Sequence, residues 1–234
     1  MKKTIGILGG MGPLATADLF EKIIRHTKAS KDGDHVRVFI DSNSSIPDRT
    51  AAIFGKGPDP VEEMSSALRN LEKCGADCII MPCNTAHYFL PRLRTMTDRP
   101  ILNMLEITGE SCADRFPGKK AAVLATRGTL STGLYEDALE RAGVEYIIPD
   151  DAEQDVLMHL IYDVVKASRP IEPEQETWAE LLNGLRKKGA DCFILGCTEL
   201  PIVAATLTEE GPFVDPTEEL AKEAIRFCGY EVLD

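Results

Sequence analysis

The chain of 234 residues is long enough for one or two compact lobes, and its 44% hydrophobic and 27% charged residues are typical of a globular protein. Its 38 acidic and 26 basic side chains give a formal net charge of −12 without any block of Lys or Arg, which argues against nucleic acid and membranes as partners. No apolar run approaches the roughly 18 residues of a membrane-spanning helix, so we expect a cytoplasmic protein.

Short apolar runs alternate with stretches of helical periodicity, and this pattern predicts an α/β fold with parallel sheets. Strands are expected at residues 4–8, 36–40, 78–81, 100–102, 121–125, 145–148, 192–195 and 212–214. Helices are expected at residues 14–29, 61–74, 130–142, 155–168 and 174–188.

An internal repeat divides this pattern into two halves. Residues 71–83 (LEKCGADCIIMPC) align without gaps with residues 185–197 (LRKKGADCFILGC), at a constant offset of 114. A second, weaker similarity at an offset of 116 matches Leu8, Gly12, Leu14 and Thr16 with Leu124, Gly128, Leu130 and Thr132. We therefore expect two pseudo-symmetric lobes, residues 1–104 and 105–215, each with a mostly four-stranded parallel sheet flanked by helices. The active site is expected in the cleft between them, at the carboxyl ends of the strands.

The seven cysteines are an odd number without C-x-x-C spacing, so we interpret them as reduced thiols. Two of them, Cys83 and Cys197, end the repeated segments where each strand is expected to give way to a helix. The other five fall inside predicted strands or helical patterns and are expected to fill the core: Cys74, Cys78, Cys112, Cys192 and Cys228.

Capping residues follow both strand-end cysteines, Asn84 and Thr85 after Cys83 and Thr198 after Cys197. Helix N-terminal N–H groups are therefore expected to lower the pKa of both thiols from about 8.5. One thiolate and one thiol on opposite sides of a small substrate suit a racemisation or epimerisation, in which a proton leaves one face and another arrives at the opposite face. Backbone donors must then stabilise the negative charge that develops on the substrate.

Other interpretations remain open at this point. A zinc site could use Cys74, Cys78, Cys83 and His87, although these residues span a helix, a strand and a loop without a paired knuckle. His87 alone, one helical turn beyond Cys83, could tune that thiol or lie on a helix surface. A two-lobed binding module without catalysis would need polar clamps but no paired thiols.

A dinucleotide site is a further alternative. Gly10-x-Gly12-x-x-Ala15 after a predicted strand satisfies a G-x-G-x-x-A fingerprint, with Asp41 as a possible ribose ligand. Pro13 at the first helical position removes one phosphate donor. This hypothesis also leaves the repeated cysteines unexplained.

Three segments resemble the signatures of aspartate racemases in the aspartate/glutamate racemase superfamily: residues 5–16 (IGILGGMGPLAT), 81–87 (MPCNTAH) and 195–201 (LGCTELP). The resemblance implies a two-base mechanism without a cofactor such as pyridoxal phosphate, and commonly a homodimer. No metal ligands are expected, because the cysteine spacing does not favour a zinc site. It also implies that the last helix, 217–227 within residues 216–234, packs back on the first lobe.

The resemblance makes Cys83 and Cys197 the catalytic pair. It assigns substrate binding to Met11, Asp48, Arg49, Thr50, Asn84, Thr85, Ala86, Thr126, Lys166, Thr198 and Glu199. Arg49 and Lys166 would hold the substrate carboxylates, a task that suits a bidentate guanidinium, whereas in the simpler interpretation both are solvated charges.

The reaction expected from this resemblance is the interconversion of L- and D-aspartate, a small acidic amino acid. Glutamate and broad-specificity racemases, maleate isomerases and decarboxylases use the same scaffold, so the fold alone does not decide the reaction.

Overall fold

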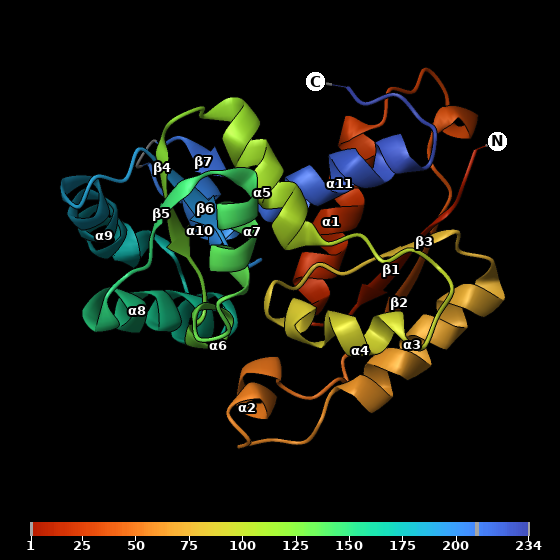
Figure 1. Cartoon of the computed structure of the whole chain (residues 1–234), viewed down its shortest axis with the longest axis horizontal. Helices are drawn as coiled ribbons and strands as arrows, with labels where there is room; N and C mark the ends of the chain where they lie inside the picture. Colours follow the sequence, from red (N-terminus) through yellow and green to blue (C-terminus); the bar gives the residue numbers. More distant parts are fainter. Residues whose placement is uncertain (1, 209–210, 234) are drawn as a thin grey trace. The chain divides into compact units, whose positions relative to one another are not determined.

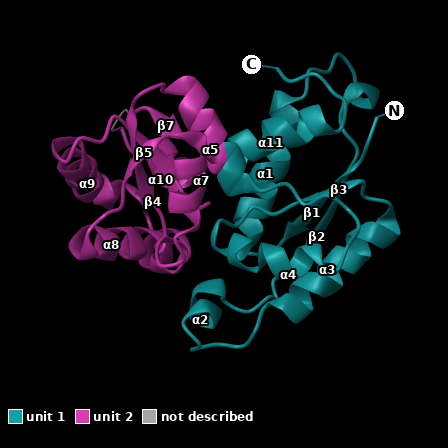
Figure 2. Ribbon diagram, in the orientation of Figure 1, with its two compact units in different colours: residues 1–107, 217–234 teal, residues 108–216 magenta. Residues whose placement is uncertain are grey.

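The computed structural model describes residues 2–208 and 211–233 and divides the chain into two compact units. Unit 1 comprises Met1–Ile107 and Thr217–Asp234, and unit 2 comprises Thr108–Pro216 (Figure 2). Each unit has a parallel sheet flanked by helices, which confirms the predicted α/β fold with two lobes. The chain passes between the units at residues 107–108 and 216–217, whereas the borders expected from the sequence follow residues 104 and 215.

The sheet of unit 1 has the strand order β2-β1-β3, from Val38–Ser42, Ile5–Gly9 and Cys78–Ile80. Both pairings are parallel, and Ile7 of β1 lies opposite Ile80 of β3. The strand predicted at residues 100–102 is reduced to one bridge between Ile79 and Ile101. Pro100 lacks an N–H group, so only its carbonyl joins the ladder, accepting from the N–H of Ile79 at 2.9 Å.

Helices cover both faces of this sheet. One face packs on α1 (Pro13–His26) and α11 (Pro216–Phe227), and the other on α3 (Val61–Cys74). Two short helices, α2 (Arg49–Ile53) and α4 (Leu90–Arg94), accompany α3. Two 3₁₀ helices complete the unit, η1 (Asp32–Asp34) and η2 (Thr85–Phe89).

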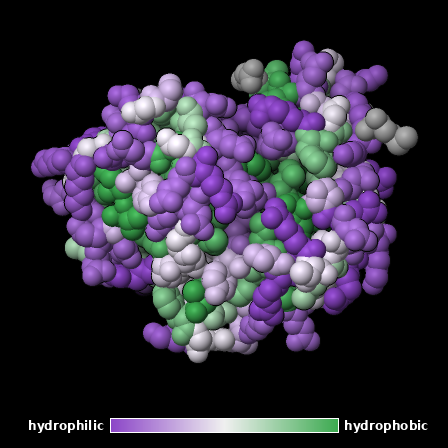
Figure 3. Space-filling model, in the orientation of Figure 1, coloured by the Kyte–Doolittle hydropathy of each residue, from purple (hydrophilic) through white to green (hydrophobic). Residues whose placement is uncertain are grey.

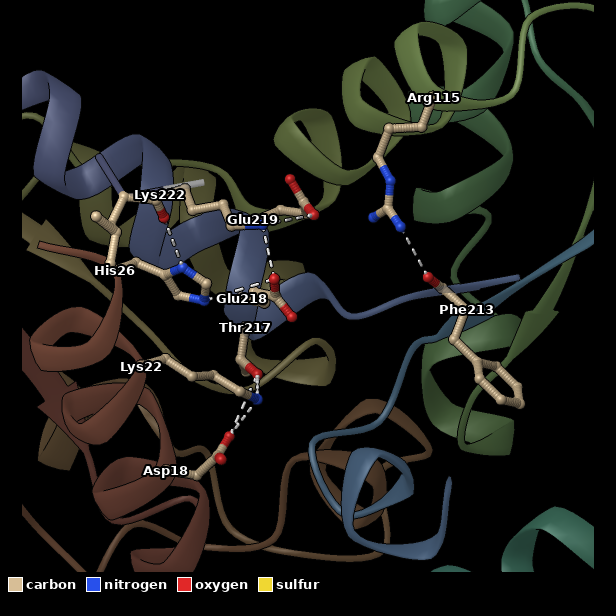
Figure 4. Close-up of polar contacts among 10 residues, drawn as sticks. Asp18, Lys22, His26, Arg115, Phe213, Thr217, Glu218, Glu219 and Lys222 are labelled. Carbon is tan, nitrogen blue, oxygen red and sulfur yellow. Dashed lines mark hydrogen bonds and ion pairs between the residues drawn. The ribbon is translucent and has the colours of Figure 1, made fainter. Parts of the chain in front are cut away.

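The C-terminal helix α11 is held on α1 by polar contacts as well as by its apolar face (Figure 4). Lys22 of α1 donates to the hydroxyl of Thr217 at 2.7 Å and pairs with Asp18. His26 Nε2 lies 3.5 Å from a carboxylate oxygen of Glu218. These contacts lie within unit 1.

Helix α1 ends three residues earlier than its periodicity predicted. Thr27 leaves the helix in an extended conformation and forms an antiparallel bridge with Val232. The N–H of Leu233 also donates to the carbonyl of His26 at 2.7 Å. The C-terminal segment therefore takes over the backbone groups that another helical turn would have used.

The sheet of unit 2 has four parallel strands in the order β5-β4-β6-β7. The strands are β4 (Lys120–Leu124), β5 (Glu145–Ile147), β6 (Cys192–Leu195) and β7 (Phe213–Val214). The helices are α5 (Met104–Arg115), α6 (Arg127–Leu130), α7 (Leu134–Ala142), α8 (Asp151–Met158), α9 (Gln175–Lys187) and α10 (Leu200–Thr206). A π-helix η3 (His159–Val165) continues α8, and a 3₁₀ helix η4 (Glu172–Glu174) precedes α9 (Figure 1).

Two helices predicted in unit 2 differ from the structure. The helix expected at 130–142 begins only at Leu134 as α7, because Gly133, with a φ of 69°, separates it from α6. The helix expected at 155–168 begins earlier, because Asp150 and Glu153 form a capping box at its start.

Helix α5 begins in unit 1 and continues into unit 2. Its last residue, Arg115, donates to the carbonyl of Phe213 in β7 at 3.2 Å (Figure 4).

Hydrophilic side chains cover most of the face shown in Figure 3, with smaller hydrophobic patches between them. Among the described residues, no helix is both long and apolar enough to cross a membrane.

The tight turn after β1 leads to a prediction about the folding stability of a glycine variant. Gly10 has a φ of +91°, and a Cβ added there would lie 2.3 Å from the backbone carbonyl of Asn43. Gly10→Ala is expected to reduce the free energy of unfolding by roughly 2–4 kcal/mol, measured by urea denaturation. Gly33→Ala is the matched control, because a Cβ there meets no atom within 4 Å. Equal small losses in both variants would contradict this account of the turn.

Candidate active site

Cys83 lies in the connection that follows β3, and only 6% of its surface is exposed. Its N–H donates to the carbonyl of Met81 at 2.9 Å, and its own carbonyl accepts from the N–H of Ala86 at 3.2 Å. Ile7 of β1 lies opposite Ile80 of β3 in the sheet. Cys83 therefore follows β3 at the same level at which the glycine-rich turn, residues 10–12, follows β1. The carboxyl ends of two neighbouring strands thus bring the turn and the cysteine to the same edge of the sheet.

Residues of this turn and of the α2 region are joined by the side chain of Arg49. The guanidinium is buried and donates to the carbonyls of Pro47 at 3.0 Å and Met11 at 3.2 Å. Asp48 is exposed and caps α2, its carboxylate accepting from the N–H of Ala51 at 2.7 Å. Arg49 and Met11, both expected at the site from the sequence, therefore contact each other directly.

Thr16 orders the glycine-rich turn, a role that was not predicted from the sequence. Its hydroxyl accepts from the N–H of Gly10 at 2.9 Å and donates to the carbonyl of Gly12 at 3.0 Å. The Gly10 N–H is thereby used within the protein, which weakens the dinucleotide hypothesis, since that motif relies on free backbone donors. A Thr three residues after Pro13 in the first turn of α1 was the available signal.

His87 is buried in unit 1, with 2% of its surface exposed, so the interpretation as a helix-surface residue is wrong. Its Nε2 accepts from the backbone N–H of Met104 at 3.1 Å. The ring proton therefore resides on Nδ1, which donates to the carbonyl of Cys83 at 2.9 Å. Burial lowers the pKa of His87 to about 4, against the opposing effect of the surrounding backbone carbonyls.

Cys197 follows β6 in unit 2 and makes side-chain contacts. Its thiol donates to a carboxylate oxygen of Glu199 at 2.9 Å, and that same oxygen accepts from the hydroxyl of Thr198 at 3.3 Å. The other carboxylate oxygen lies 3.4 Å from the ammonium group of Lys166. Glu199 thus links the cysteine to a cation.

The pKa of the Cys197 thiol is raised well above its ordinary value, which makes the expected lowering wrong for this cysteine. Burial is the main cause, and the negative charge of Glu199 adds to it. The Lys166 ammonium and the backbone N–H of Glu199 act in the opposite direction but are outweighed. Cys197 therefore holds its proton at neutral pH.

Neighbouring residues shape the surroundings of Cys197. Lys166 follows η3 and lies over the ring of Tyr162, with its Nζ 4.9 Å from the ring centroid. Thr126 is buried at the carboxyl end of β4 and caps α6, accepting from the N–H of Thr129 at 3.2 Å. The spacing of Tyr162 four residues before Lys166 was a signal for this pair in the sequence.

The site residues expected from the sequence form two groups, one in each unit. Unit 1 holds Met11, Asp48, Arg49, Thr50, Cys83, Asn84, Thr85 and Ala86. Unit 2 holds Thr126, Lys166, Cys197, Thr198 and Glu199. Asn84, Thr85 and Ala86 are buried beside Cys83 in the chain, and Thr50 is half-buried in the first turn of α2.

The zinc alternative finds no support in the part of the chain that the structure describes. No three or more His, Cys, Asp or Glu side chains gather there in a way that could hold a metal ion. Cys74 is exposed at the end of α3, so its predicted place in the core is wrong, whereas Cys78 is buried with its sulfur 3.7 Å from that of Cys228.

Comparison with known proteins identifies the family. Residues 8–224 match the family described as Asp/Glu/Hydantoin racemase. The broad specificity amino-acid racemase RacX of Bacillus subtilis is 31% identical over 229 residues, 94% of this chain and 96% of RacX. The structure resembles that of Picrophilus torridus aspartate racemase with a TM-score of 0.84 and 33% identity, covering 99% of this chain and 96% of that one.

A glutamate racemase of Lysinibacillus sphaericus is also 30% identical over 166 residues, 68% of this chain and 61% of that enzyme. These findings place the protein among the amino-acid racemases, a class of isomerases. The chain belongs to the Asp/Glu/Hydantoin racemase family, which confirms the resemblance found in its sequence.

The contacts of Glu199 predict opposite effects of two substitutions on Cys197. Glu199→Gln removes the negative charge and is expected to lower the pKa of the Cys197 thiol, whereas Lys166→Met removes the positive charge and is expected to raise it. The pH dependence of Cys197 alkylation by iodoacetamide, followed by peptide mass spectrometry, measures both changes. The exposed Cys74 serves as an internal control, and shifts of the same sign in both variants would contradict the assignment.

The burial of His87 predicts a pH-dependent stability. Its pKa of about 4 in the folded protein lies below the value of about 6.5 in the unfolded chain, so the unfolded chain binds more protons between these limits. Folding stability should therefore fall by about 3 kcal/mol from this residue as the pH decreases from 6.5 to 4. Urea unfolding at several pH values should show this loss in the wild type and a shallower dependence in His87→Asn. Parallel curves would refute the prediction.

Proposed function

We propose that the protein interconverts L- and D-aspartate, with Cys83 and Cys197 as the two groups that exchange protons with the substrate. One observation carries the proposal: a buried cysteine follows an equivalent strand in each unit, at positions that the internal repeat relates. The similarity to an aspartate racemase over 99% of the chain supports aspartate as the substrate.

The proposed reaction breaks the Cα–H bond of one enantiomer as its proton passes to the deprotonated Cys83. The electron pair left on Cα then takes the proton of the Cys197 thiol on the opposite face, which gives the other enantiomer. The protein is left with a Cys83 thiol and a Cys197 thiolate, and turnover of the opposite enantiomer restores the first state. The raised pKa of Cys197 supports its role as the proton donor in this direction.

Glu199 makes the reverse direction feasible. Its carboxylate oxygen lies 2.9 Å from the Cys197 sulfur and can accept the thiol proton when Cys197 must act as a base, while Cys83 takes up a proton from solvent and becomes the donor. Lys166, 3.4 Å from the other oxygen, stabilises the carboxylate. In this proposal Glu199 acts on the cysteine, whereas the family resemblance alone suggested that it holds the amino-acid head.

Arg49 and Lys166 supply one positive charge in each unit for a substrate with two carboxylates. Such charges matter in a protein whose formal net charge is −12, since the whole molecule repels an acidic substrate. Asn84, Thr85 and Thr198 are the proposed groups for the amino-acid head. The proposal includes catalysis without a cofactor, a cytoplasmic location and a homodimer, and sedimentation of the purified protein tests the last of these.

A broader substrate range is a second candidate function. The supporting observation is the 31% identity to RacX, named as a broad specificity amino-acid racemase, over almost the whole length of both chains. Comparison of aspartate, glutamate, alanine and arginine as substrates distinguishes the two candidates.

Proton NMR in D₂O tests the proposed function. The reduced wild-type protein should remove the α-proton signal of L-aspartate while chiral analysis shows D-aspartate appearing. Cys83→Ala and Cys197→Ala should each lower racemisation by at least about 10²-fold. Cys74→Ala is the matched control, since Cys74 is exposed at the end of α3, and it should retain activity. No conversion of any amino acid, or full activity in either active-site variant, would overturn the proposal.

A further inference from the structure

The two cysteines are held by different means. The carbonyl of Cys83 accepts from the Nδ1–H of His87 at 2.9 Å in addition to the N–H of Ala86. Cys197 shares only the backbone part of this arrangement, its carbonyl accepting from the N–H of Leu200 at 2.9 Å. We infer that His87 is a positioning residue for Cys83 alone, an inference that rests on the proposed function.

Equivalent positions in the two units can be assigned from their backbone contacts. The N–H of Ile79 donates to the carbonyl of Pro100 at 2.9 Å, and the N–H of Phe193 donates to that of Pro212 at 3.1 Å. Ile79 and Phe193 are 114 residues apart, and the two prolines are 112 apart. The helices that follow begin 112 residues apart as well, α5 at Met104 and α11 at Pro216.

The equivalences show that unit 2 lacks the whole arrangement around His87. The residue 114 positions after His87 is Pro201, which carries no side-chain hydrogen-bonding group. The counterpart of Met104, whose N–H donates to His87, is Pro216, which has no N–H. Both partners are therefore missing in unit 2.

The thiol contact, in contrast, is present in unit 2 and has no equivalent carboxylate in unit 1. Glu199 accepts from the thiol of Cys197, and the residue 114 positions earlier is Thr85, which has no carboxylate. Cys197 thus has a side-chain contact at its thiol, from Glu199, and Cys83 has one at its peptide carbonyl, from His87. The carbonyl bond from His87 sets the peptide plane of Cys83, from which the thiol projects toward the substrate in the proposed reaction.

The polar surroundings of His87 favour one neutral form of the ring. Besides the carbonyl of Cys83, those of Asn84 and Leu102 face it, and Arg94 is the nearby charged group. A protonated ring would carry an N–H at both nitrogens, so the contact with the N–H of Met104 would be lost. The neutral ring therefore ties the Cys83 loop to the first residue of α5, the helix in which the chain leaves unit 1.

Two substitutions of His87 each retain one of its hydrogen bonds, either the one to the carbonyl of Cys83 or the one from the N–H of Met104. In His87→Asn the amide N–H₂ can replace Nδ1–H and donate to the carbonyl of Cys83. In His87→Gln the longer side chain can place its oxygen near the position of Nε2 and accept from Met104, but the bond to Cys83 is lost. We expect His87→Gln to lower kcat about tenfold and His87→Asn less than about threefold.

Primary deuterium isotope effects on kcat/KM, measured separately with α-deuterated L- and D-aspartate, distinguish positioning from a general loss of structure. In the proposed mechanism Cys83 breaks the Cα–H bond of only one enantiomer, and Cys83→Ser identifies which one. Slower proton transfer at Cys83 raises the isotope effect for that enantiomer and lowers it for the other. A variant that merely contains less folded protein changes neither value.

The expected result is that His87→Gln shifts the two isotope effects in the same directions as Cys83→Ser, while His87→Asn stays near the wild type. Unchanged or equally changed isotope effects, or shifts in the direction of Cys197→Ser, would overturn the inference. Should His87→Gln fail to unfold cooperatively, His87→Ser removes both ring bonds and carries the same expectation. A wild type without activity on any amino acid overturns the proposed function, and this inference falls with it, whereas symmetric effects in an active enzyme overturn only the inference.

Discussion

The parallel pairing of a central strand with its neighbour determines where the candidate catalytic cysteine lies in each unit. β1 pairs with β3 in unit 1, and β4 pairs with β6 in unit 2. In parallel pairs both strands end at the same edge of the sheet, so the turn after one and the cysteine after the other meet there. Helices cover both faces of each sheet, which leaves this edge as the place where polar side chains collect.

Buried acid-base groups at such an edge depend on their immediate neighbours. Loss of hydration favours the uncharged form of each group, as it does for the thiol of Cys197 and the imidazole of His87. A nearby carboxylate strengthens this tendency at Cys197. Two cysteines that the repeat makes equivalent therefore have different surroundings, as the proposed reaction requires of a proton donor and a proton acceptor.

Much of the fold could be predicted from the sequence, because the strands are short apolar runs and the repeat marks their equivalents. The bounds of α3 agree with its periodicity at both ends, where Pro60 and Gly75 flank it. The end of α1 could not be predicted, since it depends on a segment some 200 residues later that pairs with Thr27. The short helices α2, α4 and α10 have too few turns for a periodic signal.

The candidate site shows the same division between local and distant information. Each cysteine and its flanking residues are contiguous in the sequence, so both motifs could be recognised without the structure. The pKa of Cys197 depends on burial and on Lys166, thirty-one residues away in the sequence. Neither effect can be predicted from the residues that flank the cysteine at the start of a helix. His87 was placed near the chemistry, but its bond to Met104 required the three-dimensional path of the chain.

The return of α11 to unit 1 has a consequence for the order in which the chain acquires its structure during synthesis. Leu220, Ala221, Ala224 and Ile225 of α11 belong to the same buried cluster as Ile5 and Ile7 of β1. Until the residues of α11 have left the ribosome, the part of this sheet face that α1 does not cover stays exposed. Unit 2 is contiguous in sequence and can close earlier, so the half that is made first is completed last.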